Sequence, residues 1–222
     1  GHLMRSGPLV VVAHHRSFFD AVLPAVVAAA NAPDMGLRHT LKKELLLSPA
    51  LDIFGHRLRN HFVDRTPLHR DIELAAFRAL ATKLDDDALV VFPEGTFYSP
   101  SRLERALERA QLRDPGRAAR IGRPQHVLPI RPGGVLSALA AAPAADVVIL
   151  GHRGFGAFSS FRDFVANTPF RAPVEVRIWR IDMTGAADDS ARLALLDTHW
   201  LTMDAWIDNG AAPSAVGSTI DR

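Results

Sequence analysis

The chain has 222 residues, of which 48% are hydrophobic, so it can bury a compact core and is not a disordered chain. Its 26 lysine and arginine residues nearly balance 24 aspartate and glutamate residues, which argues against a strongly basic nucleic-acid-binding protein. The absence of cysteine excludes disulfides, a thiolate nucleophile and cysteine-ligated zinc from this chain.

Most of the chain is expected to form one folded domain. No uncharged stretch is long and apolar enough to span a bilayer, and the N-terminal residues lack the pattern of a signal peptide. We interpret residues 1–4 as a tag scar or N-terminal remnant, residues 5–210 as the domain, and residues 211–222 as a disordered tail. An apolar run begins as early as residue 9, so removal of an N-terminal membrane anchor is one interpretation of this start.

Apolar runs and helical patterns alternate along the chain. Short apolar runs bounded by turn residues predict strands at residues 9–13, 61–64, 88–92, 126–130, 146–151 and 174–183. Helical periodicity predicts helices at residues 18–31, 42–54, 69–84, 101–112, 134–141 and 190–209. This alternation predicts a single α/β layered domain with a mixed, mostly parallel sheet flanked by helices. The last strand alternates apolar and charged residues, as expected at a sheet edge.

The segment 100–125 is rich in arginine and has little periodic apolar content after residue 112. Its pattern predicts a solvated helix followed by an arginine-rich loop. The functional alternative is a mobile basic flap that meets a phosphate group or an anionic membrane surface.

A first group of chemically capable residues follows the strand at residues 9–13. Ser17 and Asp20 have capping-box spacing, with Ser17 at the N-cap and Asp20 at the third helical position. Helical side chains lean toward the N-terminus, so the Asp20 carboxylate is expected to point back toward His15. It would then orient the imidazole and leave the other ring nitrogen to take a proton from a hydroxyl group. The alternative is an ordinary cap beside an unrelated histidine.

A second group follows the strand at residues 88–92, which ends in Pro93, Glu94, Gly95 and Thr96. The carboxyl ends of parallel strands are where open α/β folds bind ligands. There Glu94 could accept hydrogen bonds from substrate hydroxyls, and the Gly95 N–H could face a substrate oxygen. The alternative is a common strand-to-turn pattern.

Three cations are candidates for binding an anionic substrate. Arg65 follows the strand at residues 61–64 and is either a surface charge or a bidentate phosphate clamp. Lys42 and Lys43 are adjacent in a chain that has only one other lysine, Lys83, so this pair stands out.

Taken together and in order, these motifs resemble the glycerolipid acyltransferase family, in particular the 1-acyl-sn-glycerol-3-phosphate (lysophosphatidate) acyltransferases. The resemblance covers residues 9–151. The motifs that carry it are His-x-x-x-x-Asp at 15–20, Lys-Lys-Glu-Leu at 42–45, Phe-Val-Asp-Arg at 62–65, Phe-Pro-Glu-Gly-Thr at 92–96, and His-Val-Leu-Pro-Ile-Arg-Pro-Gly-Gly at 126–134.

The resemblance implies a glycerol-3-phosphate acyltransferase-like fold with residues 5–210 as the catalytic domain. It implies transfer of a fatty acyl group from acyl-CoA or acyl-carrier protein to a lysophospholipid hydroxyl, most directly that of 1-acyl-glycerol-3-phosphate, giving phosphatidate. By this resemblance His15 is the general base and Asp20 orients it, with no metal or cofactor required. The residues it assigns to acceptor binding, with the phosphate on Arg65, are Lys42, Lys43, Arg65, Glu94, Gly95 and Thr96.

One position departs from the family pattern. Members commonly have arginine directly after Glu-Gly-Thr, whereas this chain has Phe97. The acceptor is therefore either lysophosphatidate, with Arg102 or Arg131 supplying the missing cation, or another lysophospholipid. The acyl-chain preference, the choice between the two donors and the oligomeric state have no readable motif.

The expected partners are the lysophospholipid acceptor, the acyl thioester donor and the cytoplasmic face of a membrane, bound peripherally, with no nucleic acid. A first alternative is a lipid-binding protein that descends from such an enzyme and has no turnover. A second is a histidine-rich metallohydrolase, although the histidine spacings match no known ligand pattern. The histidines considered for it are His14, His15, His56, His61 and His69.

Overall fold

The computed structural model describes residues 7–42, 61–63, 75, 78–82, 84–155 and 173–210. Within this part a six-stranded sheet has the order β3-β2-β4-β1-β5-β6. All neighbouring strands are parallel except β5 and β6, which confirms the predicted mixed, mostly parallel sheet with its last strand at an edge. The strands are β1 Leu9–Ala13, β2 Leu37–Lys42, β3 His61–Val63, β4 Ala88–Val91, β5 Asp146–Arg153 and β6 Glu175–Ile181.

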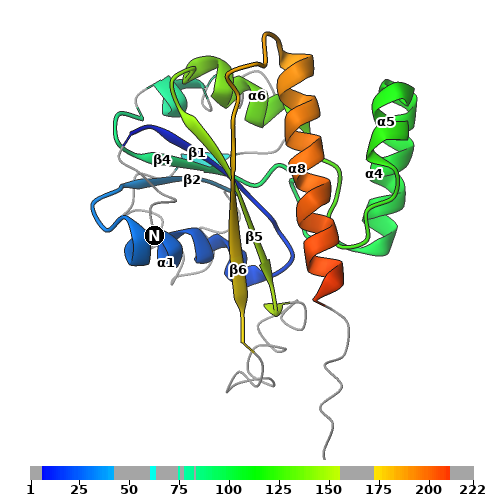
Figure 1. The fold of residues 1–222 in the computed structure, drawn as a ribbon, viewed down its shortest axis with the longest axis horizontal. Coiled ribbons are helices and arrows are strands. Elements are labelled where there is room, and N and C mark those ends of the chain that lie inside the picture. The colour runs from blue at the N-terminus through cyan, green and yellow to red at the C-terminus, as the bar shows by residue number, and fades with distance from the viewer. Residues whose placement is uncertain are drawn as a thin grey trace, which may run out of the picture.

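Helices cover both faces of this sheet (Figure 1). Helix α1 lies on one face, α6 and α8 lie on the other, and α4 and α5 stand beyond α8. The helices are the 3₁₀ helix η1 Phe18–Ala21, α1 Leu23–Asn31, α4 Pro100–Arg113, α5 Pro115–Ile121, α6 Pro132–Ala141 and α8 Asp189–Asn209. Among the described residues, no helix is both long and apolar enough to cross a membrane.

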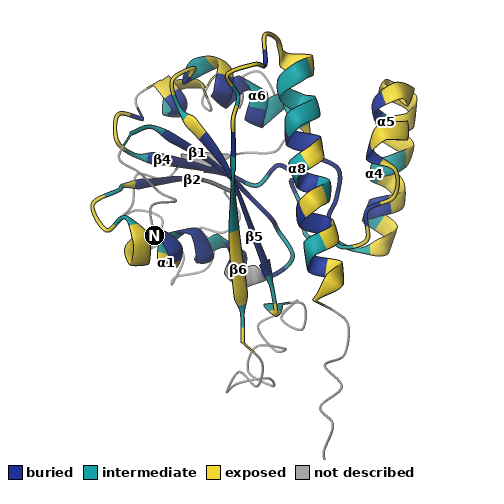
Figure 2. Cartoon of the chain, viewed as in Figure 1, coloured by how far each residue is buried: buried dark blue, intermediate teal, exposed yellow. Residues whose placement is uncertain are grey.

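Strand β1 lies in the middle of the sheet, and all five of its residues are buried (Figure 2). Because side chains alternate along a strand, β1 contributes to both halves of the core. Leu9 and Val11 pack with residues of α1, whereas Val10 and Val12 join a larger cluster that includes Val135 of α6 and several residues of α8. Strand β1 is therefore packed on both faces of the sheet, and it fixes the start of the chain segment that follows it.

Three predicted boundaries differ from the structure. Residues 18–31 form two elements, because the proline at position 24 suits the first turn of a new helix and not the interior of a long one. Position 42, predicted to begin a helix, ends β2; the rest of that prediction, residues 43–54, lies outside the described residues. Of the helix predicted at residues 69–84, residues 75 and 78–82 are described and are helical. Residue 84 is also described but is not helical.

The arginine-rich loop predicted after residue 112 is wrong, because α5 occupies this segment. The Asp114 side chain accepts the Arg117 N–H at 2.8 Å and so caps the helix. Arg117 itself is buried and forms a bidentate ion pair with Asp197 of α8, with N–O distances of 2.7 and 2.8 Å. A buried arginine thus packs α5 against the protein, where an apolar side chain is usual. The helix therefore lacks the apolar periodicity from which sequence analysis predicts helices.

The strand predicted at residues 126–130 is also wrong, although Val127, Leu128 and Ile130 are buried. Hydrogen bonds with side chains, and not with a neighbouring strand, satisfy backbone N–H and carbonyl groups of this segment. The Leu128 N–H donates to Glu94 at 2.8 Å, and its carbonyl accepts the Trp200 indole N–H at 3.0 Å. The Ile130 carbonyl accepts a hydrogen bond from the Arg117 guanidinium at 2.9 Å. We call residues 126–130 the bracing segment.

Candidate active site

Three neighbouring parallel strands, β4, β1 and β5, deliver polar residues to one edge of the sheet. Glu94 follows β4, His15 follows β1, and His152 lies near the end of β5. The carboxyl ends of parallel strands point the same way, so these side chains come together although up to 137 positions separate them in sequence. This edge is the candidate active site.

His15 and Asp20 lie close together, as their spacing predicted. His15 Nδ1 is 3.4 Å from Asp20 Oδ2, at the long end of ion-pair contact. The Asp20 carboxylate points back over the entering chain, where it accepts the backbone N–H groups of Arg16 and Ser17. The capping-box orientation of Asp20 is thereby confirmed. Since the His15 side chain is 16% exposed, its ring is partly open to a ligand.

Asp20 is a fully enclosed carboxylate, with 1% of its surface exposed. Its Oδ1 atom accepts the Ser17 hydroxyl at 2.7 Å and lies 2.9 Å from His152 Nε2. Burial alone would raise the pKa of Asp20, but the contacts from His15, His152 and Ser17 lower it below the ordinary value. Asp20 is therefore anionic at neutral pH and can stabilise a protonated imidazole.

Glu94 connects two parts of the site from within the core. One oxygen accepts the His15 N–H at 2.8 Å and the other accepts the Leu128 N–H at 2.8 Å. Burial raises the pKa of Glu94 well above its usual range, against the opposing effect of these two hydrogen bonds. The carboxyl group of Glu94 thus faces backbone groups of the protein, and its predicted contact with substrate hydroxyls stays a prediction.

Two aromatic rings flank the His15 imidazole. The Phe92 ring lies 4.7 Å from it and the Phe97 ring 4.3 Å, measured between ring centroids. The Tyr98 N–H donates to the His15 carbonyl at 3.3 Å and so ties the turn after β4 to the turn after β1. These contacts restrict the imidazole to a narrow range of orientations. Phe97, which departs from the family pattern, is therefore in direct contact with the predicted base.

Gly95 has a backbone φ of +70°, in the region that glycine adopts with little strain. Its N–H donates to the Phe92 carbonyl at 3.1 Å, and the expected contact of this N–H with a substrate oxygen stays a prediction. A Cβ atom at this position would lie 2.9 Å from Arg131 Nη1, so the guanidinium passes directly over the glycine. Arg131, one of the two substitute cations considered for the head group, therefore reaches the site edge.

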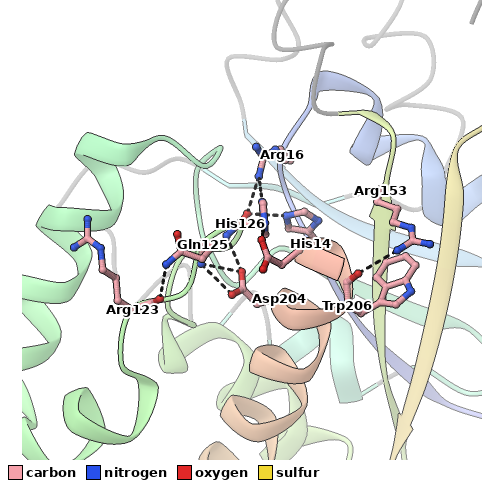
Figure 3. A network of polar contacts seen from close by, with 9 residues as sticks. His14, Arg16, Arg123, Gln125, His126, Arg153, Asp204 and Trp206 are labelled. Atoms are coloured by element: carbon pink, nitrogen blue, oxygen red, sulfur yellow. Dashed lines mark hydrogen bonds and ion pairs between the residues drawn. The ribbon is translucent and has the colours of Figure 1, made fainter. Parts of the chain in front are cut away.

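Polar contacts of His126 join the site to α8 (Figure 3). The His126 carbonyl lies between His14 Nε2 and Arg16 Nη1, at 3.4 and 3.3 Å. Asp204 of α8 accepts the His126 N–H at 2.7 Å, and Asp208 lies 2.9 Å from His126 Nε2. Burial lowers the pKa of His14 to about 3, so this histidine is a neutral hydrogen-bond donor in the core.

Several predicted site residues cannot be placed. Lys43 and Arg65 lie outside the described residues, and Lys42 is placed only as the last residue of β2. Thr96 is half-buried in the turn after β4. Arg102, the other substitute cation, donates from Nη1 to the Phe97 carbonyl at 3.0 Å.

Of the histidines considered for a metal, His56 and His69 are outside the described residues. Among the residues that are described, no group of three or more histidine, aspartate or glutamate side chains has an arrangement that could hold a metal ion. A hollow between α6, β5 and β6, lined by Asp146, Arg180 and Asp182 among others, lies at the opposite edge of the sheet, where β5 begins. None of the predicted site residues lines it.

Comparison with known families decides the identity of the chain. A family model described as Acyltransferase matches residues 2–151, which is more than half of the chain. The chain belongs to the acyltransferase family. This is the family of glycerolipid acyltransferases, which includes lysophosphatidate acyltransferases, so the resemblance seen in the motifs is confirmed. A search of curated proteins found no match.

As a member of this family, the acyltransferase transfers an acyl group to a lipid as an O-acyltransferase. The matched region contains β1, β4 and the bracing segment, and therefore every described residue predicted for the site. Helix α8 and β6 lie beyond it, yet α8 holds the bracing segment through Trp200 and Asp204.

His152 of the acyltransferase was missed by the sequence reasoning, whereas the bracing segment was included among the family motifs but was predicted to be a strand. No motif marks His152, because its importance arises from the pairing of β5 with β1, which places it beside Asp20. The useful signal would have been the apolar strand at residues 146–151, since a polar residue directly after a buried parallel strand falls at the functional edge.

Proposed function

We propose that the protein transfers a fatty acyl group from acyl-CoA or acyl-carrier protein to the free hydroxyl of a lysophospholipid. The preferred acceptor in this proposal is 1-acyl-glycerol-3-phosphate, and the product is phosphatidate. The observation that carries the proposal is the pairing of a partly open His15 with a buried anionic Asp20 at the carboxyl edge of the sheet. Family membership supports the reaction class.

The chemistry uses His15 as a general base. With Nδ1 facing Asp20, the Nε2 atom is left to take the proton of the acceptor hydroxyl. The resulting alkoxide oxygen attacks the thioester carbonyl carbon, a C–O bond forms, and the C–S bond breaks. The thiolate leaves with the proton that His15 returns. Asp20 stabilises the imidazolium between these two proton transfers, and the chain contributes no nucleophile of its own.

Acceptor binding is proposed for the residues that the motifs mark. Arg65 would pair with the acceptor phosphate, supported by Lys42 and Lys43, because guanidinium and ammonium groups bind phosphate strongly. Glu94, Gly95 and Thr96 would shape the site beside His15. The acceptor carries an acyl chain, so we also propose peripheral binding at the cytoplasmic face of a membrane.

A panel of lysophospholipids tests the function. Each would be incubated with the purified protein and labelled acyl-CoA or acyl-carrier protein, with the product identified by mass. We expect acylation of 1-acyl-glycerol-3-phosphate, and we expect His15→Ala to lower the rate about 10²–10⁴-fold, the usual contribution of a positioned base.

The matched control is His199→Ala, which removes a half-buried histidine of α8 whose Nδ1 lies 2.9 Å from the helix carbonyl of Leu195. This variant should keep wild-type turnover. Equal turnover by the wild type and by folded His15→Ala would contradict the role of His15. Binding of a lysophospholipid without any acylated product, for every acceptor and both donors, would support the lipid-binding alternative.

A further inference from the structure

His152 is a buried histidine that the proposed reaction does not use. Its side chain is 1% exposed, and its Nε2 atom lies 2.9 Å from Asp20 Oδ1. Asp20 is equally buried, and its other oxygen faces His15. One carboxylate thus lies between two imidazoles, one of which is open to a ligand and the other enclosed.

The strand register explains how His152 reaches Asp20. Strand β5 pairs with β1 in parallel, with Leu150 opposite Ala13, and the His14 N–H donates to the Leu150 carbonyl at 3.0 Å. Val148 and Leu150 belong to the core cluster on the α1 face of the sheet. Side chains two residues apart share a face, so His152 points toward the same side, where η1 holds Asp20.

We propose that His152 is a positioning residue for acyl transfer, whose Nε2 pairs with Asp20 Oδ1 at 2.9 Å and thereby holds Oδ2 toward His15. The inference rests on the proposed role of His15 as the base. His152 touches neither the hydroxyl nor the thioester in this scheme. It acts through Asp20, whose two oxygens are divided between the two histidines.

The two oxygens of Asp20 have different partners, and His152 is one of those that hold Oδ1. Oδ2 accepts the N–H groups of Arg16 and Ser17 in addition to facing His15, whereas Oδ1 has the Ser17 hydroxyl and His152. On Oδ1, the Ser17 hydroxyl can rotate about its C–O bond, so the rigid, buried imidazole is the partner that constrains this oxygen.

The His152 imidazole also packs against two other rings. Its ring centroid lies 4.9 Å from that of His14 and 5.2 Å from that of Phe155. His14 is held in turn by the His126 carbonyl. Packing against these two rings therefore limits the movement of the His152 imidazole, as a positioning residue requires.

The test compares two substitutions at one position. His152→Leu removes the donor and keeps an apolar side chain, whereas in His152→Gln the amide nitrogen can take the place of Nε2. We expect His152→Leu to lower kcat about 10–100-fold with both substrate KM values within about twofold, and His152→Gln to recover most of the loss. The control Leu150→Val, on the same face of β5, should lower the unfolding temperature without changing kcat.

A second measurement does not depend on turnover. Selective ¹³C labelling of aspartate follows ionisation of the Asp20 carboxyl by NMR. Since contact with His152 lowers the pKa of Asp20, His152→Leu should move its titration to higher pH, and His152→Gln should reverse most of this shift. If the wild type transfers no acyl group, the proposed function fails while this measurement still reports on the contact.

Two results would overturn the inference. One is wild-type kcat in His152→Leu, or a loss in His152→Gln as large as that in His152→Leu, in proteins that fold. The other is an Asp20 titration in folded His152→Leu that does not differ from the wild type. If His152→Leu does not fold, His152→Gln decides, because a folded His152→Gln with kcat lowered more than tenfold would overturn the inference.

Discussion

Glu94 shows how one side chain can serve a site without facing its ligand. Its two oxygens hold the backbone of His15 on one side and of Leu128 on the other, from a position that is 1% exposed. The base is therefore fixed through its own main chain as well as through Asp20. A glutamate after an apolar strand is easily assigned to substrate, but here its described contacts are with the protein.

Glu94→Gln should cost stability in a pH-dependent way. The amide offers one acceptor oxygen where two N–H groups need one each, which costs about 1–3 kcal/mol for the unpaired group. The folded-state pKa of Glu94 is raised, so its protonated form stabilises the fold below the unfolded value of 4.5, and this contribution is lost as pH rises toward the folded pKa. The destabilisation by Glu94→Gln should therefore be largest in acid and smaller at higher pH.

Urea unfolding of the wild type and of Glu94→Gln between pH 4 and pH 8 measures this difference. Glu108→Gln, an exposed substitution on α4, is the matched control and should leave the unfolding free energy nearly unchanged. A destabilisation by Glu94→Gln that grows with pH would contradict the raised pKa of the buried carboxyl.

At the scale of elements, the buried ion pair between Arg117 and Asp197 joins α5 to α8. Arg117→Met alone leaves a buried carboxylate unpaired and should cost about 3–5 kcal/mol. The double variant Arg117→Met, Asp197→Leu removes both charges and should recover much of that loss. Denaturant unfolding of the two single variants and the double variant forms a cycle whose coupling energy is expected to be about 1–3 kcal/mol.

The matched control for this cycle is the exposed pair of Arg123 with Glu104, which joins α4 to the segment after α5. Because exposed ion pairs contribute little, Arg123→Met should leave the unfolding free energy nearly unchanged. Equal effects of the buried and exposed substitutions would show that the Arg117 pair does not hold α5 in place.

The elements that sequence patterns predicted are those whose burial depends on apolar side chains. Strands β1, β4 and β5 were found with nearly correct bounds because each is a run of buried aliphatic residues. Strand β2 was missed because buried polar residues interrupt its apolar pattern. Arg38 is 6% exposed and pairs with Asp87 at 2.8 Å, and His39 is 1% exposed.

The candidate site was predictable where its residues are near each other in sequence. His15 and Asp20 are five positions apart, and the cap geometry between them follows from local rules. Their contacts with Glu94, Leu128 and His152 depend on which strands become neighbours, and strand order is not written in any single segment. The bracing segment was predicted as a strand because its apolar sequence indicates burial. The side chains that hydrogen-bond its backbone could not be predicted from that sequence.

At the scale of the whole molecule, the part of the chain beyond the matched family region supports the site. Trp200 of α8 donates to the Leu128 carbonyl, the Leu128 N–H donates to Glu94, and Glu94 accepts the His15 N–H. This series of hydrogen bonds runs from the C-terminal helix to the proposed base. Residues 2–151 therefore define the family, whereas the site is completed by α8.

Ending the chain at residue 155 should therefore abolish cooperative folding as well as turnover. Without α8 and β6, the aliphatic face of the sheet that includes Val10, Val12 and Ile149 would lose Trp200 and Met203 from its core cluster. Burial of such side chains is worth about 1.5–3 kcal/mol each, a large share of the ~5–15 kcal/mol by which a domain is stable. Calorimetry should show no unfolding transition for the chain 1–155 and a wild-type transition for the control chain 1–210. A cooperative transition in the shorter chain would mean that the family-matched region folds alone, and that α8 acts on the site only by positioning the bracing segment.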